Sequence, residues 1–344
     1  MNIQDNPICI GTGLVALDVV VTGSAMKDAQ FLAGGSCGNV LTILSYLGWN
    51  SYPISRLSNN VATELLIEDL HRWNVNDDLL TATEDGSTPV IIHRIMTDKL
   101  GDAKHRFEFR NPEDGKHLPA YKPVLAKDVP LVLEKSKFPN VFYFDRMNRS
   151  AIDLAKFYKA NGTVVFFEPS NSKDIKAFNE CLTIADVVKF SDDRIYDYEK
   201  QFPKAIAGLE IQTLGKSGLK YRVKGEIEWR NVDGYNVDKV VDAAGAGDWC
   251  TAGIIYSLFK DKKVEECSEK DIEHAFRFGQ ALSALNCTFE GARGLMYFIK
   301  KSELLIYIRH LVENNATSIA TKRSLNNIRQ KSPDLTIGSL FTKV

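Results

Sequence analysis

Hydrophobic residues along the chain form short β-branched or aromatic runs that alternate with longer segments of helical spacing. The runs that predict strands are Pro7–Gly13, Ser51–Arg56, Val141–Asp145, Thr163–Glu168, Asp186–Phe190 and Ala205–Thr213. Between the first two, Val40, Leu44 and Leu47 lie at i, i+4 and i+7, which is the spacing of one helix face. Strands that alternate with helices predict an α/β fold, in which helices cover both faces of a mostly parallel sheet.

Three further β-rich segments lie outside this alternation. They are Val19–Thr22, Thr88–Met96 and Arg106–Arg110. A turn around Leu100–Asp102 would join the last two. In the third segment, Phe107 and Phe109 point to one side of the strand, and the charged residues that flank them point to the other. These segments predict a small accessory sheet outside the main layers.

The C-terminal segment, Lys300–Val344, differs from the rest of the chain in charge and in pattern. It holds eight Lys or Arg and three Asp or Glu, so its net charge is +5. Ser302 is a candidate N-cap for a helix whose apolar face carries Leu304, Leu305, Ile308, Leu311 and Val312. Beyond Asn315 the pattern fades. A packed helix with a loosely ordered tail is one interpretation, and an arm that binds a partner or a second copy is the other.

Composition narrows the function classes. The chain has 344 residues, a net charge of −1 and 44% hydrophobic residues, which is typical of a globular protein with a large core. Near-neutral charge argues against nucleic-acid binding. No apolar run is long enough to span a membrane, and the first residues do not resemble a secretory signal. The six cysteines are scattered without a Cys-x-x-Cys pair, so we expect reduced thiols and a cytoplasmic protein.

A glycine motif near the N-terminus has the spacing of a dinucleotide-binding turn. It reads Gly11-Thr-Gly13-Leu-Val-Ala16. Such a turn must open a helix, whose N-terminus holds the pyrophosphate, but here a β-branched run follows. The motif therefore argues against an NAD-dependent oxidoreductase. We interpret it as the end of a strand whose bend brings Asp18 to a cleft.

A second glycine motif, Thr213-Leu-Gly215-Lys-Ser-Gly218, follows a predicted strand. Gly215-Lys-Ser resembles the end of a P-loop, but the glycine required five residues earlier is Glu210. A P-loop is therefore not supported. A glycine-bracketed turn at a nucleotide site and a plain hairpin turn into Leu219–Val223 both remain open.

Two motifs place glycines directly before a predicted helix. Gly34-Gly35-Ser-Cys-Gly-Asn39 enters the helix around Val40, and its free amides and Asn39 suit a ligand rich in oxygen atoms. Asp242-Ala-Ala-Gly245-Ala246-Gly247-Asp248 leads into the apolar helix Trp249–Phe259. Backbone amides at such a helix start form an anion hole suited to a phosphoryl group, and the helix dipole adds positive potential there. Asp248 could cap the helix, or it could accept a proton from an attacking hydroxyl.

Together these motifs resemble the ribokinase-like (pfkB) carbohydrate kinase family. They occur in the family's order, from the strand that ends at Asp18 to the Asp242–Asp248 block, with Gly291-Ala292 as a weaker fifth element. The resemblance implies a kinase domain over residues 1–300, followed by a C-terminal helix and tail at 301–344. It also implies the ribokinase-like fold, with a central mostly parallel sheet and a small β-lid from about residues 14–34 and 86–112.

The resemblance also implies roles for individual residues. Asp248 matches the catalytic base, and Gly245, Ala246 and Gly247 match the anion hole. Asp18, Gly34, Gly35 and Asn39 match contacts to sugar hydroxyls. Thr213, Gly215 and Gly218 match the nucleotide loop, and Asn286 lies near positions that flank the adenine.

Three positions depart from the family pattern. Ala243 and Ser170 stand where Thr and Asn are common, and Arg194 in Ser191-Asp-Asp-Arg stands where a Glu linked to magnesium is expected. These differences bear on the metal and on the acceptor more than on the class of reaction.

The expected activity is ATP-dependent phosphorylation of a hydroxyl group on a small sugar or sugar-like substrate. ATP and Mg²⁺ are the expected cofactors, and a monovalent cation is a further candidate. A nucleoside kinase of the same fold is the alternative within the class, and a sugar- or nucleotide-sensing protein without turnover is the alternative outside it. The expected partners are a small-molecule sugar and ATP, with no nucleic acid or membrane. A homodimer through the edge of the lid sheet is also expected.

Overall fold

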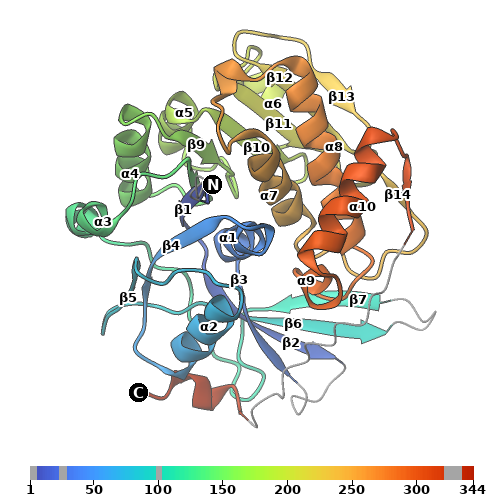
Figure 1. The fold of residues 1–344 in the computed structure, drawn as a ribbon. Helices are drawn as coiled ribbons and strands as arrows, with labels where there is room; N and C mark the ends of the chain where they lie inside the picture. Colours follow the sequence, from blue (N-terminus) through green and yellow to red (C-terminus); the bar gives the residue numbers. More distant parts are fainter. Residues whose placement is uncertain (1–5, 23–28, 98–102, 321–334) are drawn as a thin grey trace, which may run out of the picture.

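The computed structural model describes residues 6–22, 29–97, 103–320 and 335–344. Its largest element is a nine-stranded sheet in the order β13-β12-β11-β10-β9-β8-β1-β4-β5 (Figure 1). The strands from β11 to β5 run parallel, and β12 and β13 extend one edge antiparallel. The bounds are β1 (Ile8–Thr12), β4 (Asn50–Leu57), β5 (Leu80–Ala82), β8 (Val141–Phe144), β9 (Val164–Phe167), β10 (Val187–Ser191), β11 (Leu209–Thr213), β12 (Leu219–Val223) and β13 (Arg230–Val232). The predicted mostly parallel sheet is confirmed.

Helices cover both faces of this sheet. Successive residues of a strand point to opposite faces, so Val141 and Tyr143 enter one hydrophobic core while Phe142 and Phe144 enter the other. The first core is completed by α1 (Ser36–Leu47), α2 (Val61–Arg72), α7 (Ala246–Leu258), α8 (Glu269–Asn286), α9 (Gly294–Phe298) and α10 (Lys301–Glu313). The second is completed by α3 (Val129–Lys135), α4 (Arg149–Ala160), α5 (Ile175–Ile184) and α6 (Tyr198–Gln201).

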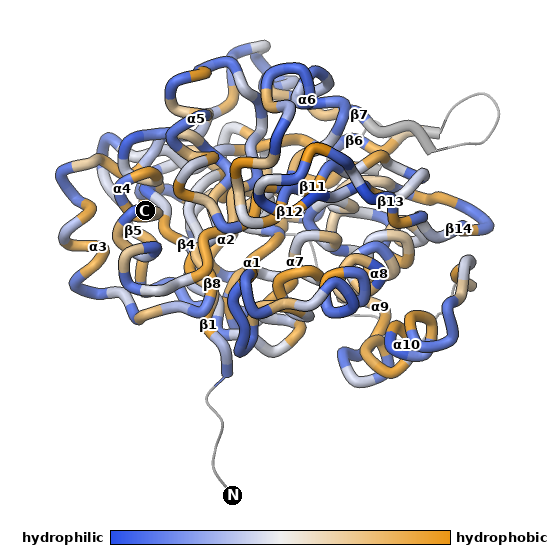
Figure 2. The backbone as a smooth tube through the Cα atoms, turned by 90° about the horizontal axis from the view of Figure 1, so that it is seen from above, coloured by the Kyte–Doolittle hydropathy of each residue, from blue (hydrophilic) through white to orange (hydrophobic). Residues whose placement is uncertain are grey.

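Helix α7 is the central helix of its layer. It packs between α1 and α8, and its Gly253 lies so close to α8 that a Cβ there would come within 2.6 Å of the Gly279 Cα atom. In Figure 2 its tube is largely orange, whereas α8 and α10 alternate between hydrophilic and hydrophobic colours. The apolar sequence of α7 fits a helix that is buried on nearly all sides, and this burial fixes the position of its N-terminal turn.

A separate four-stranded sheet has the order β3-β2-β6-β7. Its strands are β2 (Ala16–Thr22), β3 (Gln30–Gly34), β6 (Val90–Thr97) and β7 (Ala103–Glu108). We call it the small sheet, and Figure 1 shows its strands β2, β6 and β7 extending away from the large sheet, below α9 and α10. The accessory sheet predicted from the sequence is therefore present. The dimer expected through it stays a prediction.

Several predicted boundaries are wrong. The small sheet contains β3, which the sequence pattern missed, and β7 ends before Phe109. The turn predicted at Leu100–Asp102 lies outside the described residues. The strand predicted from Ala205 begins at Leu209, because the amides of Ile206 and Ala207 donate to the buried Glu210 carboxylate instead of pairing in the sheet. Helices α1 and α7 begin earlier than expected, each directly after a glycine with positive φ.

The C-terminal segment is better packed than its sequence suggests. Lys300, not Ser302, precedes the first residue of α10, and no side chain caps this helix. A two-residue strand, β15 (Ser318–Ile319), pairs with β14 (Asn236–Val237). The last ten residues return to α2, where Ile337 and Leu340 are fully buried. The prediction of a loosely ordered tail is therefore wrong for the described residues at its two ends.

Candidate active site

A cavity of about 840 Å³ lies where the parallel strands of the large sheet end. Residues that line it follow the carboxyl ends of five neighbouring strands: Leu14, Arg146, Ser170, Asp192 and Gly215. The N-terminal turns of α1 and α7 and one side of the small sheet complete the wall. Ligands of open α/β sheets bind at this edge, so the topology alone selects the cavity as the candidate active site.

The anion-hole motif forms the turn into α7. Gly245 adopts φ +73°, and a Cβ there would come within 2.1 Å of the Ala292 carbonyl oxygen, so both the backbone angle and the close approach require glycine. The buried Asp242 carboxylate accepts the amides of Ala244 and Gly291, each at 2.8 Å, and so fixes this turn against the following loop. The amide of Ala246 donates to the Ala243 carbonyl oxygen at 3.2 Å. The next amides of α7, those of Gly247 and Asp248, have no acceptor within the helix, which makes them available to an anion.

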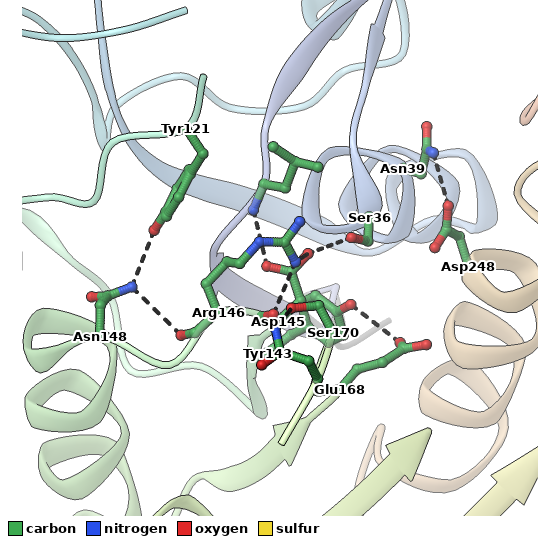
Figure 3. Close-up of polar contacts among 12 residues, drawn as sticks. Ser36, Asn39, Tyr121, Tyr143, Asp145, Arg146, Asn148, Glu168, Ser170 and Asp248 are labelled. Atoms are coloured by element: carbon green, nitrogen blue, oxygen red, sulfur yellow. Dashed lines mark hydrogen bonds and ion pairs between the residues drawn. The ribbon is translucent and has the colours of Figure 1, made fainter. Parts of the chain in front are cut away.

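Asp248 lies in the first turn of α7 and faces the cavity. Its Oδ2 accepts a 2.8 Å hydrogen bond from the Asn39 amide of α1 (Figure 3). Burial raises the pKa of Asp248 to about 8, and the nearby Glu168 carboxylate contributes to the shift, while the Asn39 hydrogen bond opposes it. A carboxylate with a raised pKa next to an anion hole can accept a proton near neutral pH.

A buried ion pair lies beneath the anion hole. Lys189 Nζ donates to Glu168 Oε1 at 2.7 Å and to the Gly247 carbonyl oxygen at 3.2 Å. Burial alone would lower the pKa of Lys189, but the Glu168 carboxylate reverses the effect and raises it, so the lysine stays charged. Glu168 also accepts hydrogen bonds from Tyr143 and Thr251. This network holds the backbone of the anion hole from below, and sequence analysis did not identify it.

At the other end of the cavity, Asp18 of β2 lies directly over Gly34. A Cβ at Gly34 would come within 2.1 Å of the Asp18 carboxylate, so this glycine makes room for the acid. Burial raises the pKa of Asp18 to about 7, and the charge of Arg293 limits that shift. The buried Arg293 is itself held by Asp69 of α2, at 2.7 Å. Asp18 is therefore a carboxylate with a fixed position that faces the cavity.

A second acid at this end follows β8. The Asp145 carboxylate is 1% exposed and accepts the Leu14 amide at 2.9 Å and the Ser36 hydroxyl at 2.5 Å. It also pairs with Arg146, which lines the cavity. The only sequence signal for these two residues is their place directly after a buried strand.

The structure brings most of the predicted site residues together. Asp18, Gly35, Asn39, Thr213, Gly215, Gly218 and Gly245–Asp248 all line the same cavity. Gly34 does not line the cavity; it packs against Asp18, which does. Thr213–Gly218 forms the hairpin turn between β11 and β12, and it still faces the cavity. The dinucleotide motif is excluded, since β1 leads into β2 rather than into a helix.

Asn286 does not fit its expected place beside the adenine. Its side chain is fully buried and does not line the cavity. Its amide donates to the carbonyl oxygens of Ala244 and Ala292, and its carbonyl accepts the Leu295 amide. The expectation is therefore corrected: Asn286 supports the anion-hole turn, and Gln280, Ser283, Ala284 and Cys287 of the same region reach the cavity instead.

The described residues give two findings about metals and membranes. Within the described ranges, no three His, Cys, Asp or Glu side chains are grouped so as to hold a metal ion. A search of the same ranges for a helix long and apolar enough to cross a membrane finds none.

Comparisons with known proteins agree with this architecture. "Probable fructokinase-6, chloroplastic" of Arabidopsis thaliana is 26% identical over 321 residues, which cover 84% of this chain and 79% of that one. A fructokinase of Vibrio cholerae, solved with fructose, ADP and a calcium ion, superposes with a TM-score of 0.65 at 18% identity, covering 88% of this chain and 99% of that one. A nucleoside kinase of Burkholderia thailandensis in complex with inosine gives the same TM-score at 14% identity, covering 88% of this chain and 97% of that one.

The match to a family model covers most of the sequence. The model of the pfkB family carbohydrate kinases matches residues 7–296, which include the whole large sheet, the small sheet and every residue of the cavity. The structural neighbours show the same ribokinase-like α/β fold. The chain therefore belongs to the pfkB family of carbohydrate kinases.

Proposed function

We propose that this chain transfers the γ-phosphoryl group of ATP to a hydroxyl group of a small sugar, with Asp248 as the proton acceptor. One observation carries the proposal: Asp248 lies in the first turn of α7, next to the Gly245–Gly247 amides, and is hydrogen-bonded to Asn39 on the acceptor side. A carboxylate that only capped the helix would not need this contact across the cavity.

In the proposed reaction, the acceptor oxygen forms a bond to the γ-phosphorus, and the bond from that phosphorus to the β–γ bridging oxygen breaks. ADP leaves, and the hydroxyl proton passes to Asp248. The backbone amides of the anion hole stabilise the charge on the transferred group. Asp248 must be ionised to accept the proton, so its raised pKa places the reaction at neutral to alkaline pH.

The two ends of the cavity suit the two substrates. Thr213–Gly218 and the turn into α7 present backbone groups for the nucleotide. At the other end, Asp18 accepts hydrogen bonds from sugar hydroxyls, and the Oδ1 atom of Asn39 is buried with no partner among the described residues. The Nδ2 atom of the same side chain donates to Asp248, so Asn39 holds the proposed proton acceptor beside the region where the reacting hydroxyl would bind.

A magnesium ion fits this site only as a partner of the nucleotide. Mg²⁺ usually binds one or two carboxylates together with substrate phosphates, and Asp192 and Asp193 line the cavity. When bound, the ion would neutralise charge on the phosphates. The chain's own contribution is the Lys189 ammonium, which holds the Gly247 carbonyl and keeps the anion hole in place.

The comparisons favour a sugar over a nucleoside as the acceptor. Curated relatives at 25–26% identity are named fructokinases or sugar kinase. Among the solved structures, fructokinases match this chain at 18–19% identity and nucleoside kinases at 14–17%. Neutral hexoses are the first acceptors to test, and nucleosides are the second.

The test is ADP release in the presence of ATP and Mg²⁺, measured over a panel of sugars, sugar phosphates and nucleosides. Phosphorus NMR of the product identifies the ester formed. We expect turnover with at least one sugar, and its loss in Asp248→Asn. Turnover with nucleosides alone would correct the acceptor class, and an absence of turnover by a folded, ATP-binding protein would refute the proposed activity.

A further inference from the structure

The acceptor end of the cavity contains a cation that the phosphoryl transfer does not require. Arg146 follows β8 directly and lines the cavity together with Leu14, Gly35 and Ser36. Acids and amides are sufficient to bind the hydroxyls of a neutral sugar, and Asp18 and Asn39 already supply them. The presence of an arginine at this end therefore calls for an explanation.

Arg146 contacts Asp145 through a single nitrogen atom of its guanidinium group. Its NH1 lies 3.2 Å from Asp145 Oδ2 and donates to the Asp145 carbonyl oxygen at 3.0 Å. Its Nε and NH2 have no hydrogen-bond partner in the described part of the chain, and its side chain is 24% exposed. Figure 3 shows the guanidinium group beside the Asp145 carboxylate, on the side of Ser36. The N–H groups of these two nitrogen atoms are thus left for a ligand.

Asp145 serves as a support and does not compete for the ligand. Its carboxylate accepts the Leu14 amide and the Ser36 hydroxyl, pairs with Arg146 and is 1% exposed. The close approach of Gly13 reinforces this position, because a Cβ there would come within 1.6 Å of Asp145 Oδ1. A buried carboxylate with a fixed position holds the guanidinium in one orientation, so little side-chain entropy is lost when a ligand binds.

The chemistry of this arrangement selects an anion. A guanidinium group offers parallel N–H donors that match the two oxygens of a carboxylate or phosphate, and such charge-assisted pairs are stronger than bonds to neutral hydroxyls. The cavity that Arg146 lines also contains the apolar Leu14 and Ile91.

We propose that the acceptor carries an anionic group, a phosphate ester or a carboxylate, which Arg146 binds at the end of the sugar away from the reacting hydroxyl. This inference rests on the proposed sugar kinase activity and specifies its substrate class. Arg146 is thus a residue that determines acceptor specificity, and Asp145 positions it.

The experiment compares matched acceptors in the ADP-release assay: fructose, its 1-phosphate and 6-phosphate esters, and the sugar acid 2-ketogluconate. We expect kcat/KM to be about 10- to 100-fold higher for an anionic acceptor than for fructose, which is the effect of a hydrogen bond to a charged group. The phosphate esters and the sugar acid distinguish the two sources of negative charge.

Variants separate recognition from structure. Arg146→Gln should lower the ratio of kcat/KM for the anionic and the neutral acceptor to near one, and Arg146→Lys should retain part of it. The matched control is Arg149→Gln, which removes the same charge three residues later, where Arg149 pairs with Asp153 on the surface of α4. It should leave the ratio unchanged. Melting temperatures establish that each variant is folded.

Two results would overturn the inference, and they differ from a failure of the proposed function. One is efficient turnover of fructose with no preference for an anionic acceptor. The other is a preference for anionic acceptors that survives in Arg146→Gln. If no acceptor is phosphorylated, the proposed activity fails. Calorimetric titration with the same esters and acid still decides the subsite, because binding that is lost in Arg146→Gln supports it and equal binding or none refutes it.

Discussion

The two ends of the cavity are built from different parts of the chain. The end that we propose for the nucleotide presents backbone groups in tight turns, with Gly215, Gly218 and Gly245 at positive φ. The end that we propose for the acceptor presents charged side chains, Asp18 and Arg146, each held by buried partners. Asp248 lies between the two ends and contacts Asn39 across the cavity.

This difference explains which end is recognisable in a sequence and which end sets specificity. A turn that needs positive φ and close backbone approach admits few residues other than glycine, so its glycines form a motif that can be recognised in the sequence. A side-chain contact changes with the ligand. We therefore expect backbone groups to supply most contacts to the phosphates that every reaction shares, and side chains such as Arg146 to supply the contacts that distinguish one acceptor from another.

The largest effect should come from the residue between the two ends. Asp248→Asn keeps the size of the side chain but removes the proton acceptor, and such a loss typically lowers kcat by about 10²–10⁴-fold. ATP affinity should persist, because the anion-hole amides remain. Steady-state kinetics and calorimetric titration with ATP measure the two quantities. A folded variant with nearly wild-type kcat would leave only a capping role for Asp248.

The backbone end is tested by adding a single methyl group. Gly245→Ala places a Cβ against the Ala292 carbonyl oxygen and strains a backbone with φ +73°. If this displaces one donor of the anion hole, kcat should fall about 10²–10³-fold. Gly115→Ala is the matched control, since Gly115 has φ +72° and open space where a Cβ would lie. Equal activity of the two variants would show that the turn into α7 does not contribute to transfer.

The side-chain end should respond in KM rather than in kcat. Asp18→Asn removes a charged acceptor of hydroxyl hydrogen bonds, so we expect the KM for the sugar to rise by about tenfold while the KM for ATP is unchanged. Asp153→Asn, on the surface of α4, is the control. A larger loss in kcat than in KM would place Asp18 in the transition state instead of in acceptor binding.

The smallest effect on activity should come from the C-terminal end. Deletion of residues 335–344 removes Ile337 and Leu340 from their contacts with the core that includes α2, and each buried side chain contributes up to about 1.5–3 kcal/mol of stability. The melting temperature should fall, while kcat and both KM values at a permissive temperature stay unchanged. A rise in the KM for ATP would mean that this end of the chain also supports the cavity.

The same contrast decides how much could be predicted from the sequence. Strand–helix alternation predicts the parallel sheet, and the Asp242–Asp248 block predicts the anion hole, since both follow from local pattern. Asp145 and Arg146 have no such signal, because Asp145 is fixed by Leu14 and Ser36, which are more than 100 residues away in the sequence, and Arg146 is held by Asp145. Long-range contacts of this kind become visible only in the fold.

Two further residues illustrate the limit. Lys189 is a single charge inside an apolar strand, which indicates a buried ion pair but does not name Glu168 as the partner. Ile337 and Leu340 are two apolar residues in a polar segment, too few to form a periodic pattern, yet both are fully buried. Asn286 was placed beside the adenine by resemblance, and its hydrogen bonds place it beneath the anion-hole turn.

The most direct test of the central claim, that Asp248 accepts the hydroxyl proton, is the pH dependence of kcat/KM. Burial raises the pKa of Asp248 to about 8, so the ionised, active form becomes scarcer as the pH falls below that value. We expect kcat/KM to rise with pH up to about 8 and then to level off, and this dependence should be absent from the residual activity of Asp248→Asn. The Asp18 carboxyl, with its pKa of about 7, adds a second step in the same direction that Asp18→Asn removes. A wild-type profile that is flat from pH 6 to pH 9, or a step near pH 8 that remains in Asp248→Asn, would contradict the account.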